Sequence, residues 1–408
     1  MANAASPFLP LHLSHADATY LKELVHVLVQ HQVVSYERYL HEDQERLDNK
    51  RWKQVLQRDN VRVFTELQGS NPAEDAGLGF IDQQQSSEST DVPALLTVGF
   101  MEGSLDNAMY GLMTPTVESM RLKYFYAGDQ LANGAVLTTI DRPTATNPFQ
   151  SLTVKWVEGY QPPVVRSIIN NRDFVYMEAT GFTKLSDGEL VGYQLLHSVH
   201  FPQTTKVRGN VRGTMSICGL YRQRNHSVVD IFSKASVNSG GRVARSLVVK
   251  YCSAALISAR KMVHCARLKK LAWLLRLRDT GNNGGFIRGD PKCIGCGQTP
   301  GVFANGIGAC SLCKRALCSS CRVKIELGFI GLGGGLVKNK MWFCTYCIDE
   351  AGRTNARRVA CGEYAGIRLA ESTPWSSGLT NSSSPSNSER SDDWGSLESK
   401  RYLNLLPR

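Results

Sequence analysis

The length, composition and charge of this chain describe a globular protein of two or three domains that favours anionic partners. Its 408 residues are 42% hydrophobic and 20% charged, and no apolar run approaches the roughly 20 residues of a membrane-spanning helix. The net charge of +11, from 47 Lys plus Arg against 36 Asp plus Glu, favours phosphoinositide membranes, other acidic lipids or nucleic acid. Residues 1–17 lack a basic region followed by a long apolar stretch, so we expect no secretory signal and a cytoplasmic protein.

A helix followed by strands is predicted after an N-terminal arm at residues 1–16. Apolar residues recur there at spacings of three and four, which places them on one helix face: Leu21, Leu24, Val25, Leu28 and Val29. A turn at Asp59-Asn60 is then flanked by strand-forming residues such as Val55 and Val61. The polar stretch at about residues 68–91, rich in Gln, Ser, Asp and Glu, predicts a mobile insert.

Residues 94–240 carry repeated strand signals that are broken by Gly, Pro, Asn and Asp. A short helix is predicted within this region at residues 102–113. The remaining signals predict a curved antiparallel sheet, with strands at residues 95–101, 137–140, 152–157, 174–183, 190–200 and 227–235.

One long basic helix is predicted at residues 243–278. A stripe of apolar and small residues steps along it by three and four: Val248, Cys252, Ala255, Ala259, Met262 and Ala266. Ten basic residues and no acidic one lie between Arg242 and Arg278. The basic face of this helix either contacts an anionic membrane or is simply exposed to solvent, and we favour the membrane contact. The residues expected to make it are Lys269, Lys270, Arg276 and Arg278. A hinge is predicted at residues 281–290, where glycine and asparagine end the helix.

Eight of the twelve cysteines crowd into residues 293–347 as four C-x-x-C pairs. In a cytosolic chain such pairs indicate metal ligands before disulfides, and four thiolates saturate a structural zinc ion. Sequential and interleaved arrangements are both open. Because only four residues separate the second and third pairs, we favour the interleaved arrangement, in which the first and third pairs bind one ion and the second and fourth pairs bind the other. The predicted cofactors are two structural Zn²⁺ ions, one on Cys293, Cys296, Cys318 and Cys321, the other on Cys310, Cys313, Cys344 and Cys347.

This spacing, with C-x2-C-x4-C-x2-C in its middle, resembles that of FYVE-type zinc fingers, and we place the domain at residues 291–351. Members of that family that bind phosphatidylinositol 3-phosphate carry W-x-x-D, R-R/K-H-H-C-R and R-V-C elements. The corresponding segments here, residues 286–290, 305–309 and 341–343, lack those Arg and His donors, which argues against tight binding of that lipid. The resemblance also implies a membrane-inserting loop at Val302, Phe303 and Ile307, with inward packing of Phe303 as the alternative.

The larger N-terminal part resembles START lipid-transfer domains. The resemblance lies in residues 52–63, in Arg172-Asp173-Phe174, in Val211-Arg212-Gly213 and in the long helix that follows Gly240-Gly241. It implies an α+β helix-grip fold, in which an antiparallel sheet wraps a long C-terminal helix around an apolar cavity for one lipid. A filled cavity without a lipid is the alternative. The domain is placed at residues 17–280.

The sequence contains no convincing catalytic set. It has no G-x-S-x-G elbow, no P-loop and no H-E-x-x-H, and its nine histidines are dispersed. We therefore expect a protein without enzymatic activity. Residues 352–408 are rich in Ser, Asn, Pro and Asp and predict a disordered tail.

The expected function is that of a zinc-binding peripheral membrane adaptor that binds lipid, in the cytoplasm and on endosomal membranes. Its expected partners are an anionic or endosomal membrane lipid and an apolar lipid ligand. The alternative is a zinc-finger module that binds a protein partner without lipid. Nucleic-acid binding through the basic helix is a third and less favoured reading, which predicts steeply salt-dependent retention on DNA or RNA.

Overall fold

The computed structural model describes residues 6–67, 92–129, 131–159, 170–280, 292–299 and 308–364. The predicted insert at 68–91 and the predicted hinge at 281–290 lie outside these residues. The chain forms two compact units. The sheet unit comprises Met1–Gly284, Ile325–Met341 and Ala351–Ile367, and the cysteine unit comprises Gly285–Lys324, Trp342–Glu350 and Arg368–Arg408.

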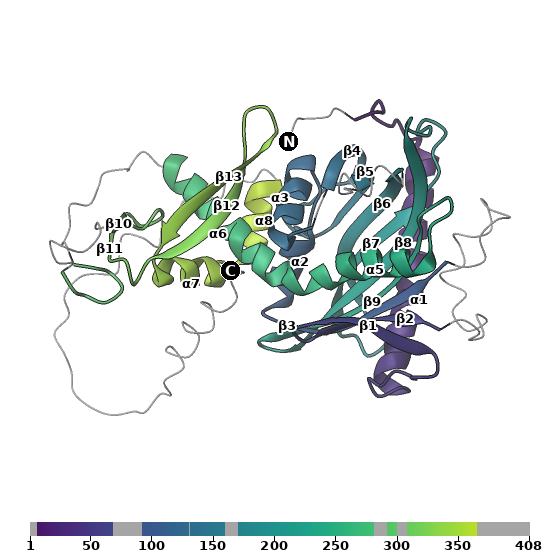
Figure 1. Ribbon diagram of the computed structural model, residues 1–408, viewed down its shortest axis with the longest axis horizontal. Coiled ribbons are helices and arrows are strands. Elements are labelled where there is room, and N and C mark those ends of the chain that lie inside the picture. Colours follow the sequence, from purple (N-terminus) through teal and green to yellow (C-terminus); the bar gives the residue numbers. More distant parts are fainter. Residues whose placement is uncertain are drawn as a thin grey trace. The chain divides into compact units, whose positions relative to one another are not determined.

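A nine-stranded sheet forms the body of the sheet unit, in the order β1-β2-β3-β9-β8-β7-β6-β5-β4 (Figure 1). Its neighbours pair antiparallel, and one additional short pairing, between β6 and β8, is parallel. The strands are β1 (Trp52–Arg58), β2 (Val61–Glu66), β3 (Ala94–Glu102), β4 (Leu131–Asp141), β5 (Ser151–Gly159), β6 (Asn171–Lys184), β7 (Leu190–Ser198), β8 (Asn210–Asn225) and β9 (Val228–Asn238). The predicted curved antiparallel sheet, and with it the α+β class, is confirmed.

The helices and the small strands complete the chain. The helices are α1 (His15–His41), α2 (Leu105–Leu112), α3 (Val117–Ala127), α5 (Arg245–Leu256), α6 (Met262–Thr280), α7 (Thr345–Arg353) and α8 (Ala356–Tyr364). Two hairpins are formed by β10 (Gly308–Ala309) with β11 (Ala316–Leu317) and by β12 (Val323–Ile330) with β13 (Leu336–Phe343). No helix among the described residues is long and apolar enough to cross a bilayer.

Helix α1 covers one face of the sheet. It begins with a capping box in which Asp17 N donates to Ser14 Oγ and the Asp17 carboxylate accepts from Ser14 N. The helix packs on β7 and β8, and the predicted apolar face is the buried one. Leu11, in the predicted N-terminal arm, is buried in the same core and donates its N–H to Leu137 O. The arm is therefore part of this core from at least that residue.

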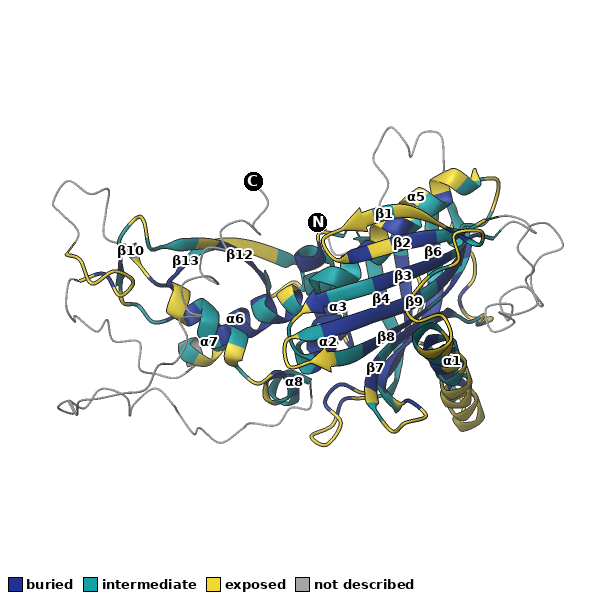
Figure 2. Cartoon of the chain, turned by 90° about the horizontal axis from the view of Figure 1, so that it is seen from below, coloured by how far each residue is buried: buried dark blue, intermediate teal, exposed yellow. Residues whose placement is uncertain are grey.

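The alternation of strand side chains divides the sheet into two buried faces (Figure 2). On β5, Trp156 and Val154 join the core under α1, while Val157 packs in a second cluster with Met120 of α3. The face opposite α1 is contacted by α2, α5 and the segment after α5. We call it the enclosed face. Because helices lie on both sides, few strand positions between β5 and β9 reach solvent.

The predicted single helix at 243–278 is divided. A 3₁₀ segment, Ile257–Lys261, separates α5 from α6. The predicted stripe is buried at Val248 and Met262, but Ala255 is exposed and Ser253 is buried in its place. The tighter 3₁₀ turn rotates the helix face, so a stripe drawn at strict α-helical spacing fails on the α5 side.

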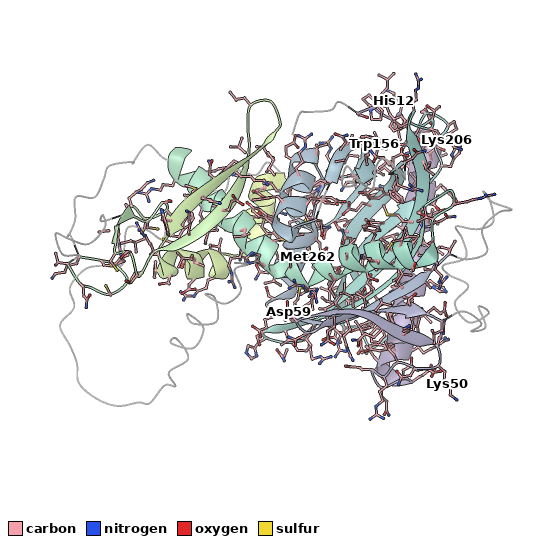
Figure 3. All side chains as sticks on the ribbon, in the orientation of Figure 1. His12, Lys50, Asp59, Trp156, Lys206 and Met262 are labelled. Atoms are coloured by element: carbon pink, nitrogen blue, oxygen red, sulfur yellow. The ribbon has the colours of Figure 1, made fainter. Side chains whose placement is uncertain are left out.

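The R-D-F and V-R-G segments have a structural role. Asp173 is fully buried, and its Oδ2 accepts from Arg212 Nη2 at 2.8 Å and from Trp156 Nε1 at 2.9 Å. In the short parallel pairing, Asp173 lies opposite Arg212. Trp156, labelled in Figure 3, comes from β5. The charged pair thus ties three strands together at one end of the sheet.

The predicted disordered tail begins too early. Residues 352–364 contain the end of α7 and the whole of α8, which contacts α2 and α6. Ala356, Val359 and Ala360 are buried on α8, and Arg357 Nε donates to Asp106 at 2.8 Å. The prediction was wrong because it used the average composition of residues 352–408, which is polar, although the first part of this segment has a short apolar helix face. Residues 365–408 lie outside the described part.

Candidate functional site

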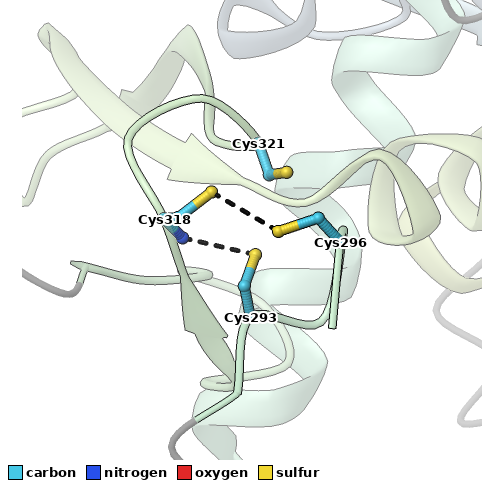
Figure 4. Close-up of side chains that lie close together, drawn as sticks. All are labelled: Cys293, Cys296, Cys318 and Cys321. Carbon is cyan, nitrogen blue, oxygen red and sulfur yellow. Dashed lines mark hydrogen bonds between the residues drawn. The ribbon is translucent and has the colours of Figure 1, made fainter. Parts of the chain in front are cut away.

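The structure brings the eight clustered cysteines into two groups of four. Cys293, Cys296, Cys318 and Cys321 form one group (Figure 4), and Cys310, Cys313, Cys344 and Cys347 form the other. In each group all sulfur atoms lie within 4.8 Å of one another. These are the two interleaved quartets that the sequence predicts, and each could hold one metal ion.

The sulfur spacing fits zinc. Tetrahedral zinc with Zn–S bonds of about 2.3 Å requires neighbouring sulfur atoms to be roughly 3.8 Å apart. Cys296 Sγ and Cys318 Sγ are 3.9 Å apart in the first quartet, and Cys313 Sγ and Cys344 Sγ are 3.8 Å apart in the second. A disulfide would require a sulfur–sulfur distance of about 2.05 Å. The four-thiolate set is the one typical of a saturated structural site, without a position for a reacting water.

Two of the C-x-x-C pairs form the same local turn. Gly297 N donates to Cys293 O at 2.8 Å, and Lys314 N donates to Cys310 O at 2.9 Å. Gly297 and Lys314 directly follow the second cysteine of their pairs, and both have a left-handed φ, of 70° and 59°. This conformation turns both sulfur atoms of a pair to one side.

The approach between the first and third pairs requires a glycine. A Cβ added at Gly295 would lie 2.8 Å from Cys321 Cβ and 3.0 Å from its Sγ. Real side chains do not tolerate this separation, so any larger residue would push the two pairs apart. The glycine in C-I-G-C is therefore needed for the first quartet to close.

The interleaving follows from strand β11. The spacer between the second and third pairs, residues 314–317, contains this strand, which pairs with β10. The second pair lies in the turn before this strand and the third pair follows its other end, so the two pairs flank β11 at opposite ends. Cys318 N instead donates to Cys293 Sγ at 3.3 Å, and Cys344 N donates to Cys310 Sγ at 3.4 Å. Each quartet thus joins pairs that are not consecutive in the chain.

The basic residues of the cysteine unit balance its thiolates. Its described residues contain five basic and two acidic side chains. Two zinc ions with four thiolates each would carry a formal charge of about −2 apiece, which brings the sum over these described residues to about −1. Arg322 and Lys324 both lie over the Trp342 ring, at 4.5 and 5.2 Å from its centroid. With two zinc ions bound, the basic side chains among the described residues would compensate the thiolate charge and leave no positive surplus.

The predicted membrane contact on the basic helix is wrong for two of its residues. Lys269 and Lys270 are 3% and 1% exposed. Lys269 Nζ donates to Tyr110 O at 2.7 Å and to Met113 O at 3.2 Å, at the C-terminal end of α2. The reason for the error is that α2 and α8 pack around α6, and α8 was not predicted.

Lys270 joins three segments of the sheet unit. Its Nζ donates to Asn107 Oδ1 at 2.8 Å, to Gly352 O at 2.7 Å and to Thr354 O at 2.9 Å. Of the other residues predicted to contact a membrane, Arg276 is exposed and pairs with Glu363, and Arg278 is half-buried. The predicted membrane-inserting residues lie outside the described part of the chain: Val302, Phe303 and Ile307.

The buried lysines predict an unusual pH dependence. Burial lowers the pKa of Lys269 and of Lys270 from 10.5 to about 8. Between these values the unfolded chain binds more protons than the folded chain, so the free energy of unfolding should rise with pH between about 8 and about 10. We expect Lys269→Met to flatten this rise in urea unfolding series, while Lys250→Met, at an exposed position of α5, keeps it. An equal slope in the native protein and in Lys269→Met would contradict the burial argument.

A charged pair is buried on the enclosed face. Lys155 Nζ of β5 and Glu178 Oε2 of β6 are 2.5 Å apart, with side-chain exposures of 1% and 5%. Lys155 Nζ also donates to Thr114 O and Oγ1, and Gln194 Nε2 donates to Glu178 Oε1 at 2.7 Å. Burial lowers the pKa of Lys155. Burial alone would raise the pKa of Glu178, but the Lys155 ammonium brings it below its ordinary value.

Among the buried hydroxyls that have no hydrogen-bond partner in the described residues, two belong to β3 and α5. Thr97 of β3 is 0% exposed and Ser253 of α5 is 2% exposed, and neither side-chain oxygen is paired. Helix α5 contacts β3, so both belong to the layer between the sheet and the helix. Unpaired buried hydroxyls cost stability unless a water or a ligand satisfies them. The sequence pattern does not distinguish these groups or the charged pair, because polar residues that alternate along a strand ordinarily indicate a solvent-facing side.

Comparisons with known proteins give similarity in structure alone. No protein family and no curated protein matches the sequence. Human STARD10 is similar with a TM-score of 0.38 and 13% identity, over 60% of this chain and 84% of that chain. Human StAR-related lipid transfer protein 5 has a TM-score of 0.37 and 15% identity, over 58% and 98%. A STAR-related lipid transfer protein from Xanthomonas axonopodis has a TM-score of 0.36 and 13% identity, over 52% and 98%. Values this low assign neither a family nor a function.

Proposed function

We propose that this protein is a lipid-binding peripheral membrane adaptor, with two structural zinc ions in a FYVE-like cross-brace and a START-like sheet unit that holds one lipid. The observation that carries the zinc part is the pair of interleaved cysteine quartets with sulfur separations of 3.8 and 3.9 Å. Zinc would be held by the eight thiolates and would supply folding energy to the cysteine unit. The saturated ligand sets give it no reaction to catalyse.

The enclosed face supports a lipid ligand. It combines apolar side chains with the Lys155–Glu178 pair and the unpaired hydroxyls of Thr97 and Ser253. An amphipathic molecule matches this lining, because its apolar body would contact the cluster around Val157 and its polar groups would satisfy the hydroxyls. A purely apolar ligand would leave the hydroxyls unpaired.

A protein-interaction module is the second candidate. The near-neutral charge of the cysteine unit favours it over an anionic-lipid reader, because five basic side chains already balance the thiolates. On this reading the protein carries zinc and no lipid. The two functions therefore differ in what the purified protein retains.

Native mass spectrometry of the purified full-length protein tests the proposal. We expect two zinc ions per chain and a co-purifying adduct with the mass of one lipid. Ser253→Phe should lower the lipid-bound fraction several-fold, because the ring would fill the layer between α5 and the sheet. Ala254→Phe, at the adjacent exposed position of α5, is the matched control and should retain the lipid. Two zinc ions without any lipid, before and after incubation with a cellular lipid extract, would favour the protein-interaction module.

A further inference from the structure

The turn between β12 and β13 carries an apolar surface. Residues 327–337 are all Gly, Leu, Phe, Ile or Val. Leu332 in the turn is fully exposed, with a relative exposure of 113%, and Val337, the second residue of β13, is 46% exposed. A single exposed leucine needs no explanation. Here the exposed leucine lies at the tip of a hairpin in which eleven consecutive residues, from the end of β12 through the glycine-rich turn to the start of β13, have no polar side chain, and this combination does need one.

Helix α3 holds this hairpin in place. Tyr126 Oη accepts from Gly328 N at 3.1 Å and donates to Gly328 O at 3.3 Å. The Arg121 guanidinium donates to Gly334 O, and within the turn Gly334 N donates to Gly331 O at 2.8 Å. All of these residues belong to the sheet unit. The exposed apolar turn is thus fixed before any partner binds, which lowers the entropic cost of binding.

Two exposed lysines follow the turn on β13. Lys338 and Lys340 are exposed, and the Lys338 ammonium lies 4.8 Å from the centroid of Phe125 on α3. Glu326 is the one acidic residue in residues 323–343. Lys338 lies three residues after Gly335 along β13, a distance of about 10 Å. Apolar faces of peripheral proteins enter the boundary between headgroups and acyl chains by about 5–10 Å, so an inserted turn would place Lys338 at the lipid phosphates.

We infer that the tip of the β12–β13 hairpin, residues 330–337, docks the protein on an anionic bilayer by inserting Leu332 and Val337, while Lys338 and Lys340 contact lipid phosphates. This inference rests on the proposed function, since it supplies the membrane contact that the buried Lys269 does not provide. Figure 1 shows the turn extending past the ends of both strands. No other described part of the hairpin combines exposed apolar and basic side chains in this way.

Charge favours a membrane over a second copy of the chain. Two turns that met apolar side to apolar side would bring Lys338 and Lys340 of both copies together, and like charges at close range oppose such pairing. An anionic surface complements the same lysines. The occupant is therefore a bilayer that contains acidic lipids.

Vesicle flotation of the full-length protein tests the inference. We expect the native protein to float with vesicles of phosphatidylcholine plus phosphatidylserine and less with phosphatidylcholine alone. Leu332→Asp should weaken binding about tenfold or more, because it places a charge in the acyl region. Lys340→Gln should weaken binding to the acidic vesicles about fivefold, the equivalent of one basic contact. Leu190→Asp, at a 45% exposed leucine on β7, is the matched control and should bind as the native protein does.

Three outcomes would overturn the inference: no flotation of the native protein, equal flotation of Leu332→Asp, or a native dimer that Leu332→Asp splits in sedimentation. Native mass spectrometry of the same samples reports bound zinc and lipid independently. Retained zinc and lipid without flotation would refute the docking turn and the membrane contact, and would leave the zinc-binding and lipid-binding parts of the proposed function standing. Loss of both would refute both.

Discussion

Replacing Cys293, Cys296, Cys318 and Cys321 together by serine is expected to remove one zinc ion per chain and to leave the other in place. The four sulfur atoms form one quartet, and the second quartet shares none of them. A sequential arrangement would predict a different result, because the same four substitutions would take two thiolates from each ion and both would be lost. Elemental analysis of the reduced, full-length protein distinguishes one equivalent from none.

Removal of both ions should unfold the cysteine unit. Structural zinc contributes on the order of 10–16 kcal/mol of apparent binding free energy in zinc-finger peptides, which exceeds the stability of an ordinary domain. The part of the unit that the structure describes has few buried apolar side chains to replace this contribution, among them Leu312, Leu317 and Phe343. Hydrogen exchange after chelation should therefore show loss of protection at residues 308–321, while the nine-stranded sheet stays protected.

Cys361→Ser is the matched control for these experiments. Cys361 lies on α8 outside both quartets and is only partly buried. The variant should keep two zinc ions and the exchange pattern of the native protein. Equal protection of residues 308–321 with and without chelator would refute the structural role of the metal.

Lys155→Met should be the most damaging single substitution in the sheet unit. It leaves the Glu178 carboxylate buried without its cation, and breaking a buried pair in this way costs about 3–5 kcal/mol. The native charge pair is hydrogen-bonded on both sides, through Thr114 and Gln194. The loss should appear as a lower midpoint of urea unfolding with an unchanged slope.

The double variant Lys155→Met with Glu178→Leu should recover most of that loss. Two apolar side chains of similar volume remove both charges, and such replacements are often neutral or stabilising. Lys22→Met is the exposed control: it breaks the 2.6 Å pair with Asp141, in which Lys22 is 50% exposed, and should cost at most about 1 kcal/mol. A double variant less stable than Lys155→Met would show that the pair contributes net stability.

The cysteine quartets could be predicted from the sequence because their chemistry is local. A C-x-x-C turn presents two thiolates whatever surrounds it, and the short spacer at residues 314–317 contains β11, which the second and third pairs flank at opposite ends. The apolar face of α1 and most strands were predictable for a similar reason. Apolar residues that recur with a period of 3.6 residues indicate a helix, and those that recur with a period of 2 residues indicate a strand. The break at Ile257–Lys261 was not, because a 3₁₀ segment has no distinct apolar pattern.

Which polar residues are buried was decided by the tertiary structure alone. Lys155 and Glu178 occupy strand positions that ordinarily face water, and Lys269 and Lys270 belong to a run of basic residues that indicates a solvated or membrane-bound helix face. All four are buried because helices from distant parts of the chain, including α8, cover both the sheet and α6. The sequence by itself determined the metal ligands and the sheet, since these depend on near neighbours. The buried charges and the exposed turn at Leu332 depend on which surfaces remain uncovered after the helices pack. The spacing of residue types along the sequence does not predict this.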